Sequence, residues 1–295
     1  MSLRWLYHIV RSDEAEASLG ESYAPPSLAR EGFLHASYQP EVVQSARVHF
    51  AGDAALTVLR IDPRRLDVPV HVAETPRGPM PHIHGPVPAD AIIDELDLDA
   101  VTAAPDRVTG TRFAFVAFEG MTLLDLVGAY DPIARIASMG FDPASSCEIV
   151  SAQGFRAWQG ALAELRVTRV RPDLGEFDVV VVAGGPATRA LVENPDVTAW
   201  LAEFPSNRLI ASVCTGALLL GAAGRLQGRR ATTHARALEL LGVYGAVAVR
   251  ERIVDEGQLI TAAGVTSGID LCLHLVKRLV GEAAANAIAA RMELK

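Results

Sequence analysis

The chain has 295 residues, half of them hydrophobic, and a formal net charge of −8 at pH 7. This length and hydrophobic content suffice for two domains of ordinary size with buried cores. Acidic residues outnumber basic ones in both halves, which argues against a nucleic-acid partner. No apolar run is long enough to span a bilayer, and the amino terminus lacks a secretory signal pattern. We therefore expect a cytoplasmic protein without a membrane partner.

Three cysteines, Cys147, Cys214 and Cys272, are spread widely along the chain. Their odd number excludes a closed disulfide framework, and their spacing is not that of metal ligands. We interpret Cys147 and Cys272 as structural residues, the latter on the apolar face of a helix. We expect neither a metal nor an organic cofactor.

The first domain is predicted over residues 1–100 as a small mixed α+β domain. It opens with an aromatic-rich, strand-like stretch at 3–10, continues with a helix near 40–49, and has further strand patterns at 55–61 and 70–74. Three short motifs punctuate it: Tyr7-His-Ile9, Gly32-Phe-Leu-His-Ala-Ser37 and Pro81-His-Ile-His-Gly-Pro86.

These three motifs resemble those of a small bacterial family of unknown function, which is distantly similar to the ADP-ribosyltransferase fold. The resemblance implies that His8, His35 and Glu74 face one cleft, with His8 orienting a ribose and Glu74 stabilising positive charge. The alternative is that both histidines are satisfied core residues and Glu74 is a solvated strand residue. His82 and His84 alternate and would share a strand face, but no third metal ligand lies nearby in the sequence.

A linker is predicted over Asp97 to Gly110, where Ala, Pro, Thr, Asp and Gly mix without apolar periodicity. The second domain is then predicted over residues 111–295. It opens with a strand at 112–118, a glycine turn and a helix, and the same strand–turn–helix order recurs twice. This repetition indicates an α/β fold with a doubly wound parallel sheet, in which reactive loops lie at the carboxyl ends of the strands.

Residues 209–224 form an apolar run, a Cys-Thr-Gly corner and a stretch of small and aliphatic residues closed by Gly224. We interpret this as a buried strand, a tight turn and a helix, with Cys214 at the corner. The helix dipole and unpaired N–H groups there are expected to lower the thiol pKa from its ordinary value of ~8.5 and to make Cys214 a nucleophile. The alternative is a buried structural cysteine.

Four motifs in order, Ala183-Gly-Gly-Pro186, Ala211–Gly216, Arg230–His234 and Ala263–Asp270, resemble the ThiJ/PfpI superfamily of class I glutamine-amidotransferase-like proteins, which have a flavodoxin-like fold. The similarity is closest to isonitrile hydratases and to the sensing domains of AraC-type regulators. It implies Cys214 as nucleophile, Asp125 as its acidic partner and Thr215 holding water or that carboxyl group. Backbone N–H groups of Gly185 and Thr215 would polarise an intermediate, and Gly184 would belong to the same oxyanion or substrate-binding site. His234 would support the site, and the protein would be a homodimer.

On this resemblance the leading hypothesis is a hydro-lyase that adds water to an isocyanide, its small-molecule substrate, and yields an N-substituted formamide. Asp125 has the alternative role of a helix cap, and Glu119 is the second candidate acid. Ala129 and Ala235 depart from the hydratase pattern and put the substrate in doubt. The alternatives are a non-catalytic binding module related to AraC-type regulators, or another cysteine-dependent reaction such as glyoxal hydration.

Overall fold

The computed structural model describes residues 3–18, 22–52, 55–154, 156–159 and 163–294. The chain divides into two compact units, the first Leu3–Val108 and the second from Thr109 onward. The first unit thus ends later than the predicted residue 100. Residues that were predicted to form a linker pack into it: Val108 N–H donates to Leu3 O at 3.0 Å, and Val101 is fully buried. Their lack of periodicity in sequence reflects irregular structure, not a free linker.

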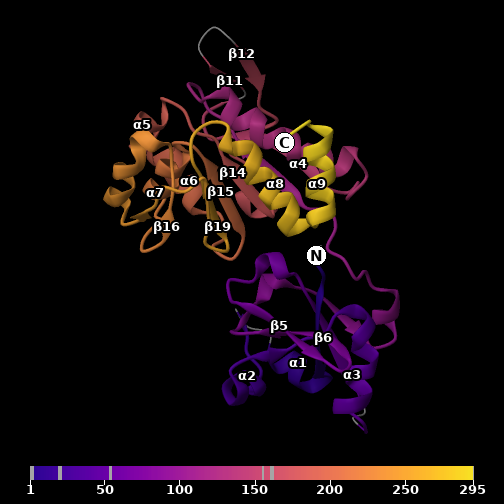
Figure 1. Ribbon diagram of the computed structural model, residues 1–295. Helices are drawn as coiled ribbons and strands as arrows, with labels where there is room; N and C mark the ends of the chain where they lie inside the picture. The colour runs from indigo at the N-terminus through magenta and orange to yellow at the C-terminus, as the bar shows by residue number, and fades with distance from the viewer. Residues whose placement is uncertain (1–2, 19–21, 53–54, 155, 160–162, 295) are drawn as a thin grey trace. The chain divides into compact units, whose positions relative to one another are not determined.

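Two three-stranded antiparallel sheets build the first unit (Figure 1). An isolated bridge between Tyr7 and Ser37 joins them, and two further short strands form a pair of their own. In spatial order the strands are β1 (Leu6–Arg11), β4 (Leu56–Ile61) and β8 (Ile92–Asp97) in one sheet, β3 (Leu34–His35), β6 (Gly78–Ile83) and β5 (Val70–Thr75) in the other, and β2 (Ser22–Tyr23) with β7 (Val87–Pro88) in the pair.

The described residues of this unit also form the short helices α1 (Ser12–Ser18), α2 (Pro26–Glu31) and α3 (Val42–His49). Turns of 3₁₀ helix lie at Gln39–Glu41, Pro63–Arg65, Ala89–Ala91 and Ala100–Ala103. Alternate residues of β1 face two separate apolar clusters, Leu6 and Val10 in one and Tyr7 and Ile9 in the other. Such alternation is what a strand buried on both faces requires. The predicted small mixed α+β domain is confirmed.

The second unit contains a seven-stranded sheet, parallel except for its edge strand β18. Its central strands β14, β15 and β19 are buried along their whole length, as parallel strands covered on both faces must be. In spatial order the strands are β13 (Arg169–Val170), β10 (Ser146–Ser151), β9 (Arg112–Val116), β14 (Val179–Val182), β15 (Leu209–Val213), β19 (Leu259–Ala262) and β18 (Ile253–Asp255).

Helices cover both faces of this sheet, which confirms the predicted doubly wound α/β fold (Figure 1). One layer is formed by α4 (Leu123–Ser138), α8 (Ser267–Leu279) and α9 (Glu282–Arg291). The other is formed by α5 (Thr188–Leu191), α6 (Pro195–Ala202) and α7 (Gly216–Ala222). Peripheral elements are β11 (Arg156–Gln159), β12 (Ala163–Arg166), β16 (Arg230–Ala231), β17 (Val247–Ala248), and 3₁₀ segments at Leu174–Glu176 and Ala235–Tyr244.

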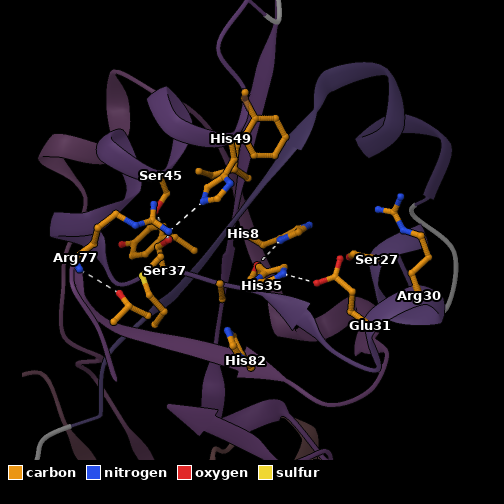
Figure 2. A pocket seen from close by; sticks show the side chains of 16 residues that line it. His8, Ser27, Arg30, Glu31, His35, Ser37, Ser45, His49, Arg77 and His82 are labelled. Atoms are coloured by element: carbon orange, nitrogen blue, oxygen red, sulfur yellow. Dashed lines mark hydrogen bonds and ion pairs between the residues drawn. The ribbon is translucent and has the colours of Figure 1, made fainter. Parts of the chain in front are cut away.

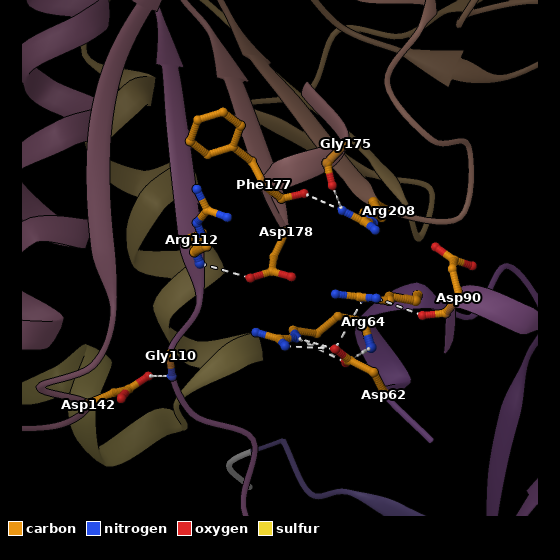
Figure 3. A network of polar contacts seen from close by, with 11 residues as sticks. Asp62, Arg64, Asp90, Gly110, Arg112, Asp142, Gly175, Phe177, Asp178 and Arg208 are labelled. Atoms are coloured by element: carbon orange, nitrogen blue, oxygen red, sulfur yellow. Dashed lines mark hydrogen bonds and ion pairs between the residues drawn. The ribbon is translucent and has the colours of Figure 1, made fainter. Parts of the chain in front are cut away.

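Buried carboxylates fix irregular backbone within each unit (Figure 3). In the first unit Asp62 accepts hydrogen bonds from the backbone N–H of Arg64 at 3.0 Å and from its guanidinium at 2.7 Å. In the second, Asp178 accepts from the N–H of Arg112 at 2.8 Å, where β9 begins. Each carboxylate satisfies a backbone donor that no regular element pairs. Within the described residues, every helix is too short or too polar to cross a membrane.

Candidate functional site

Cys214 stands at the corner between β15 and α7, as the sequence predicts. Its φ of 56° lies in the left-handed region that residues with a side chain rarely adopt. The corner is held by the Cys214 N–H, which donates to Ala263 O at 2.8 Å, and by the Thr233 hydroxyl, which donates to Cys214 O at 2.7 Å. The thiol is buried, and the backbone N–H groups of Val265 and Thr215 hydrogen-bond to its sulfur.

Asp125 lies in the first turn of α4 and is fully buried. Its carboxyl group hydrogen-bonds to the Cys214 thiol. Oδ2 also accepts from the Gly184 N–H at 3.2 Å, whereas Oδ1 is buried with no hydrogen-bond partner in the described part of the chain. Asp125 is therefore aimed at the thiol and is not the residue that caps α4.

Gly184 is the point at which the site converges. A Cβ added there would lie 2.6 Å from the Thr215 nitrogen, 2.8 Å from Asp125 Oδ2 and 2.9 Å from Cys214 Cβ. All three distances are shorter than a real Cβ contact, so only glycine allows the loop after β14 to pass between the acid and the thiol. Gly185 is equally confined, since its Cβ would lie 2.5 Å from the Cα of Met121.

Burial shifts both ionisable groups toward their neutral forms. It raises the pKa of Asp125 to about 6, against the lowering effect of hydrogen bonds from Cys214 and Gly184. It also raises the pKa of the Cys214 thiol, and the neighbouring Asp125 charge raises it further. The expected lowering of the thiol pKa at the helix start is therefore wrong. The two amides that hydrogen-bond to sulfur favour the thiolate, but desolvation outweighs them.

The glycine amides are used differently from what the sequence suggests. The Gly184 N–H donates to Asp125, and the Gly185 N–H donates to Thr215 Oγ1 at 2.8 Å. The Thr215 hydroxyl in turn donates to Gly185 O at 3.0 Å. The Gly185 amide, expected to polarise an intermediate, and the Thr215 hydroxyl, expected to hold water or the Asp125 carboxyl group, are therefore hydrogen-bonded to each other instead. The Thr215 N–H, also expected to polarise an intermediate, does lie at the Cys214 sulfur. Thr215 locks the glycine loop, and the amides that reach the sulfur are those of Thr215 and Val265.

Val265 is the functional position that the sequence reasoning missed. It follows β19 with a φ of 33°, the second strained residue beside the thiol. Its signal is the Ala263–Asp270 motif, whose first glycine, Gly264, packs against His234: an added Cβ would lie 2.8 Å from the ring. His234 itself caps the following 3₁₀ segment, accepting from the Arg236 N–H at 3.3 Å. It supports the site by packing.

The remaining candidates of this unit lie apart from the pair. Glu119 is exposed. Burial raises the pKa of Cys147 to about 12 and also raises that of the fully buried Cys272, as expected for structural cysteines. No cluster of three or more His, Cys, Asp or Glu side chains among the described residues is arranged to hold a metal ion.

The first unit holds a cavity of about 460 Å³ that His8 and His35 both line (Figure 2). His8 is buried, with Nδ1 2.7 Å from His35 O and Nε2 2.9 Å from the Tyr23 hydroxyl. Burial lowers its pKa to about 4, so His8 is neutral and both ring nitrogens are occupied. Glu74 is exposed on β5 and does not line the cavity. The structure thus brings the two histidines together, does not bring Glu74 to them, and gives His8 the role of a satisfied core residue.

Comparison with known proteins agrees with this arrangement. Residues 111–278, more than half of the chain, match the DJ-1/PfpI family. The chain belongs to the DJ-1/PfpI family. Residues 9–95 match a second family, described only as a protein of unknown function (DUF952). The DJ-1/PfpI unit therefore carries an additional domain on its amino-terminal side, as both sequence resemblances indicated.

Three similar proteins illustrate the range of this DJ-1/PfpI unit. An isonitrile hydratase of Pseudomonas putida is 34% identical over 183 residues, which span 62% of this chain and 78% of the relative. A crystal structure of a ThiJ/PfpI family protein from Pseudomonas syringae is 30% identical with a TM-score of 0.56, covering 63% of this chain and 76% of that one. The transcriptional regulator GbdR of Pseudomonas aeruginosa is 28% identical over 192 residues, 62% of this chain and 51% of its own length.

Proposed function

We propose that the second unit is an isonitrile hydratase-like hydro-lyase, which adds water to the terminal carbon of an isocyanide and releases an N-substituted formamide. The observation that carries the proposal is the buried Asp125–Cys214 pair, hydrogen-bonded to each other beside Gly184. The likeness to the isonitrile hydratase of P. putida supports this choice among cysteine-dependent reactions.

The pair holds one acidic proton at neutral pH. With the pKa of Asp125 near 6 and that of Cys214 raised, the resting form is a thiol donating to a carboxylate. Moving this proton from sulfur to Asp125 gives a thiolate and a carboxylic acid without exchange with solvent. The amides of Val265 and Thr215 stabilise the thiolate when it forms. Reactivity then requires no free thiolate in the resting protein.

In the first step the Cys214 thiolate attacks the terminal carbon of the isocyanide, and Asp125 delivers its proton to that carbon. A carbon–sulfur bond forms, the carbon–nitrogen triple bond becomes a double bond, and the product is a thioimidate with Asp125 as carboxylate. General acid catalysis by a carboxyl group suits this role because its pKa lies near neutrality.

In the second step Asp125 takes a proton from water, whose oxygen adds to the thioimidate carbon. Asp125 Oδ1, which has no partner in the described part of the chain, is the oxygen available to this water. The proton then passes to the substrate nitrogen. Collapse of the adduct expels the Cys214 thiolate, returns a proton to Asp125 and leaves the formamide. The formamide therefore contains all the atoms of one isocyanide molecule and one water molecule.

A second candidate function is small-molecule sensing without chemistry, favoured by the likeness of this unit to GbdR over half of that regulator. The same buried corner would then recognise a ligand, and Cys214 would be structural. We propose a small-molecule ligand in either case and, from the family resemblance, a homodimer. Sedimentation equilibrium would measure the oligomeric state directly.

The deciding experiment follows formamide formation from a panel of alkyl and aryl isocyanides by mass spectrometry. The parent is compared with Cys214→Ala and Asp125→Asn, and Cys147→Ala and Glu119→Gln are the matched controls. We expect turnover by the parent and both controls, and none by the two site variants. Turnover that survives in Cys214→Ala would overturn the mechanism. Absence of turnover in the parent, with saturable binding of a small molecule, would favour sensing.

A further inference from the structure

The cavity of the first unit has no assigned ligand. Its walls come from β1, β3, β6, α2, the end of α3 and the turn between β5 and β6, so distant segments of the chain meet around it. A volume of about 460 Å³ lies within the range of small-molecule sites. The side chains that face it are shown in Figure 2.

Basic groups dominate the ionisable lining. Arg30 and Arg77 supply permanent positive charge, and one acid, Glu31, faces the cavity with them. The histidines His35, His49 and His82 also line it, but burial lowers the pKa of His49 and of His82, which favours their neutral forms. Glu31 is already engaged, with Oε2 2.8 Å from His35 Nε2. The remaining electrostatic preference of the cavity is therefore for a negatively charged group.

Arg77 is the group best placed to meet an anion. It lies in the turn between β5 and β6, where its backbone N–H donates to the Thr75 hydroxyl at 3.2 Å. Its Nη2 donates to His49 Nε2 at 3.0 Å. Its Nη1 is shielded from solvent and makes no hydrogen bond within the described part of the chain. The Arg77 side chain lines the cavity, so an oxyanion bound there would gain a charge-assisted interaction with the guanidinium group.

Part of the cavity lining is apolar. Tyr7, Ile9, Phe50 and Met80 face the cavity, and His8 adds an imidazole whose two nitrogens are already hydrogen-bonded. These groups offer contact area but no polar partner, which suits the hydrocarbon or aromatic part of a ligand. Inorganic phosphate alone would leave this part of the cavity unfilled.

A second basic cavity, in the other unit, provides a contrast. It is lined by Arg208, Arg225 and Arg229, but all three guanidinium groups donate to backbone carbonyls of their own unit. It has fewer apolar groups in its lining. Arg229→Gln therefore serves as a control that detects anion binding in this second cavity instead of in the cavity of the first unit.

We propose that the cavity between β1, β3 and β6 binds a small organic oxyanion, a carboxylate or phosphate monoester, with Arg77 holding the anionic group and Tyr7, Ile9, Phe50 and Met80 contacting the apolar body. The proposal concerns the first unit alone and is independent of the chemistry at Cys214.

Isothermal titration of the full chain tests this with three probes: benzoate, phenyl phosphate, and benzamide as the neutral analogue of benzoate. We expect one anion bound per chain, and binding of benzamide weaker by about tenfold or more, because the charge-assisted hydrogen bond is lost. Comparing benzoate with phenyl phosphate distinguishes the two anion classes. Failure of both anions to saturate, or equal binding of benzamide, would overturn the proposal.

Variants locate the site. Arg77→Gln should weaken anion binding about tenfold or more. Substitution of the exposed Arg47 on α3, Arg47→Gln, should leave the affinity for the anion unchanged. Ser27→Trp, at the cavity wall on α2, should block binding with Arg77 intact and so serves if Arg77→Gln fails to fold. Equal losses in Arg77→Gln and Arg47→Gln, or a loss only in Arg229→Gln, would refute the assignment.

Discussion

The carboxyl group of Asp125 and the thiol of Cys214 are hydrogen-bonded to each other in the interior, although one belongs to the start of α4 and the other to the corner after β15. The Asp125 charge raises the pKa of the thiol, whereas the hydrogen bond from the thiol lowers the pKa of Asp125, so the two groups titrate as a pair. The site thus stores a proton between an acid and a nucleophile, and several outcomes follow from that relationship.

Gly184→Ala should destabilise the second unit and abolish any activity that depends on the pair. The new Cβ would lie 2.6 Å from the Thr215 backbone nitrogen, a contact that only a backbone shift relieves. Overpacking of this kind costs roughly 1–3 kcal/mol. Gly242→Ala, whose Cβ meets nothing within 4 Å, is the control. Thermal unfolding compares the two variants. Equal melting temperatures would contradict the close packing of Gly184 against Thr215, Asp125 and Cys214.

Cys214 should be alkylated slowly by iodoacetamide at pH 7 and faster only as the pH rises above its ordinary thiol range, because burial and Asp125 raise its pKa. Asp125→Asn removes the negative charge and should shift the rate profile to lower pH. Mass spectrometry of the Cys214 peptide follows the reaction. Rapid alkylation of the parent at pH 7 would show that the amides at sulfur outweigh desolvation.

Asp125→Asn should raise the free energy of unfolding at pH 7. The pKa of Asp125 is raised from 3.8 to about 6 on folding, so its contribution is fully present below pH 3.8 and is lost as the pH rises through about 6. The uncharged asparagine side chain does not ionise, so the variant does not lose stability in this pH range. We expect its free energy of unfolding at pH 7 to exceed that of the parent by about 1–3 kcal/mol. Denaturant unfolding at pH 4 and pH 7 tests this prediction. The difference in the free energy of unfolding between variant and parent should be smaller at pH 4 than at pH 7.

Thr215→Ser should retain the site, whereas Thr215→Val should loosen it. The hydroxyl that bridges the Gly185 N–H and C=O is present in serine and absent in valine, which leaves a buried amide without an acceptor. The cost is about 1–3 kcal/mol. Chemical denaturation of the two variants compares them. A valine variant as stable as the serine variant would remove the locking role of Thr215.

His8 should stay neutral well below the usual histidine range. Its pKa is lowered from 6.5 to about 4 by burial, so the stability it contributes is present above pH 6.5 and is lost as the pH falls toward 4. Nitrogen-edited NMR of the imidazole from pH 8 to pH 5 should show no titration at this ring. A midpoint near 6.5 would place His8 in contact with solvent and reopen its role in the cleft.

The sequence by itself determined the architecture of both units. Continuous apolar runs such as 179–182 and 209–213 are what parallel strands with two covered faces require, and glycine-rich corners follow them. It also determined that Cys214 stands at such a corner and that Asp125 begins a helix at the same sheet edge. These are properties of local pattern and chain order, so the residues alone carry them.

Tertiary structure decided the electrostatics and the partners. The direction of the thiol pKa depends on how deeply Cys214 is buried and on the distance to Asp125, and neither is written in the local sequence. The same holds for the glycine amides and for Val265, because hydrogen-bond partners across a sheet edge come from segments far apart in the chain. In the first unit, His8 is buried with both ring nitrogens hydrogen-bonded, whereas Glu74 is exposed to solvent. A strand pattern predicts that successive side chains alternate between two faces, but it does not predict which segments cover each face.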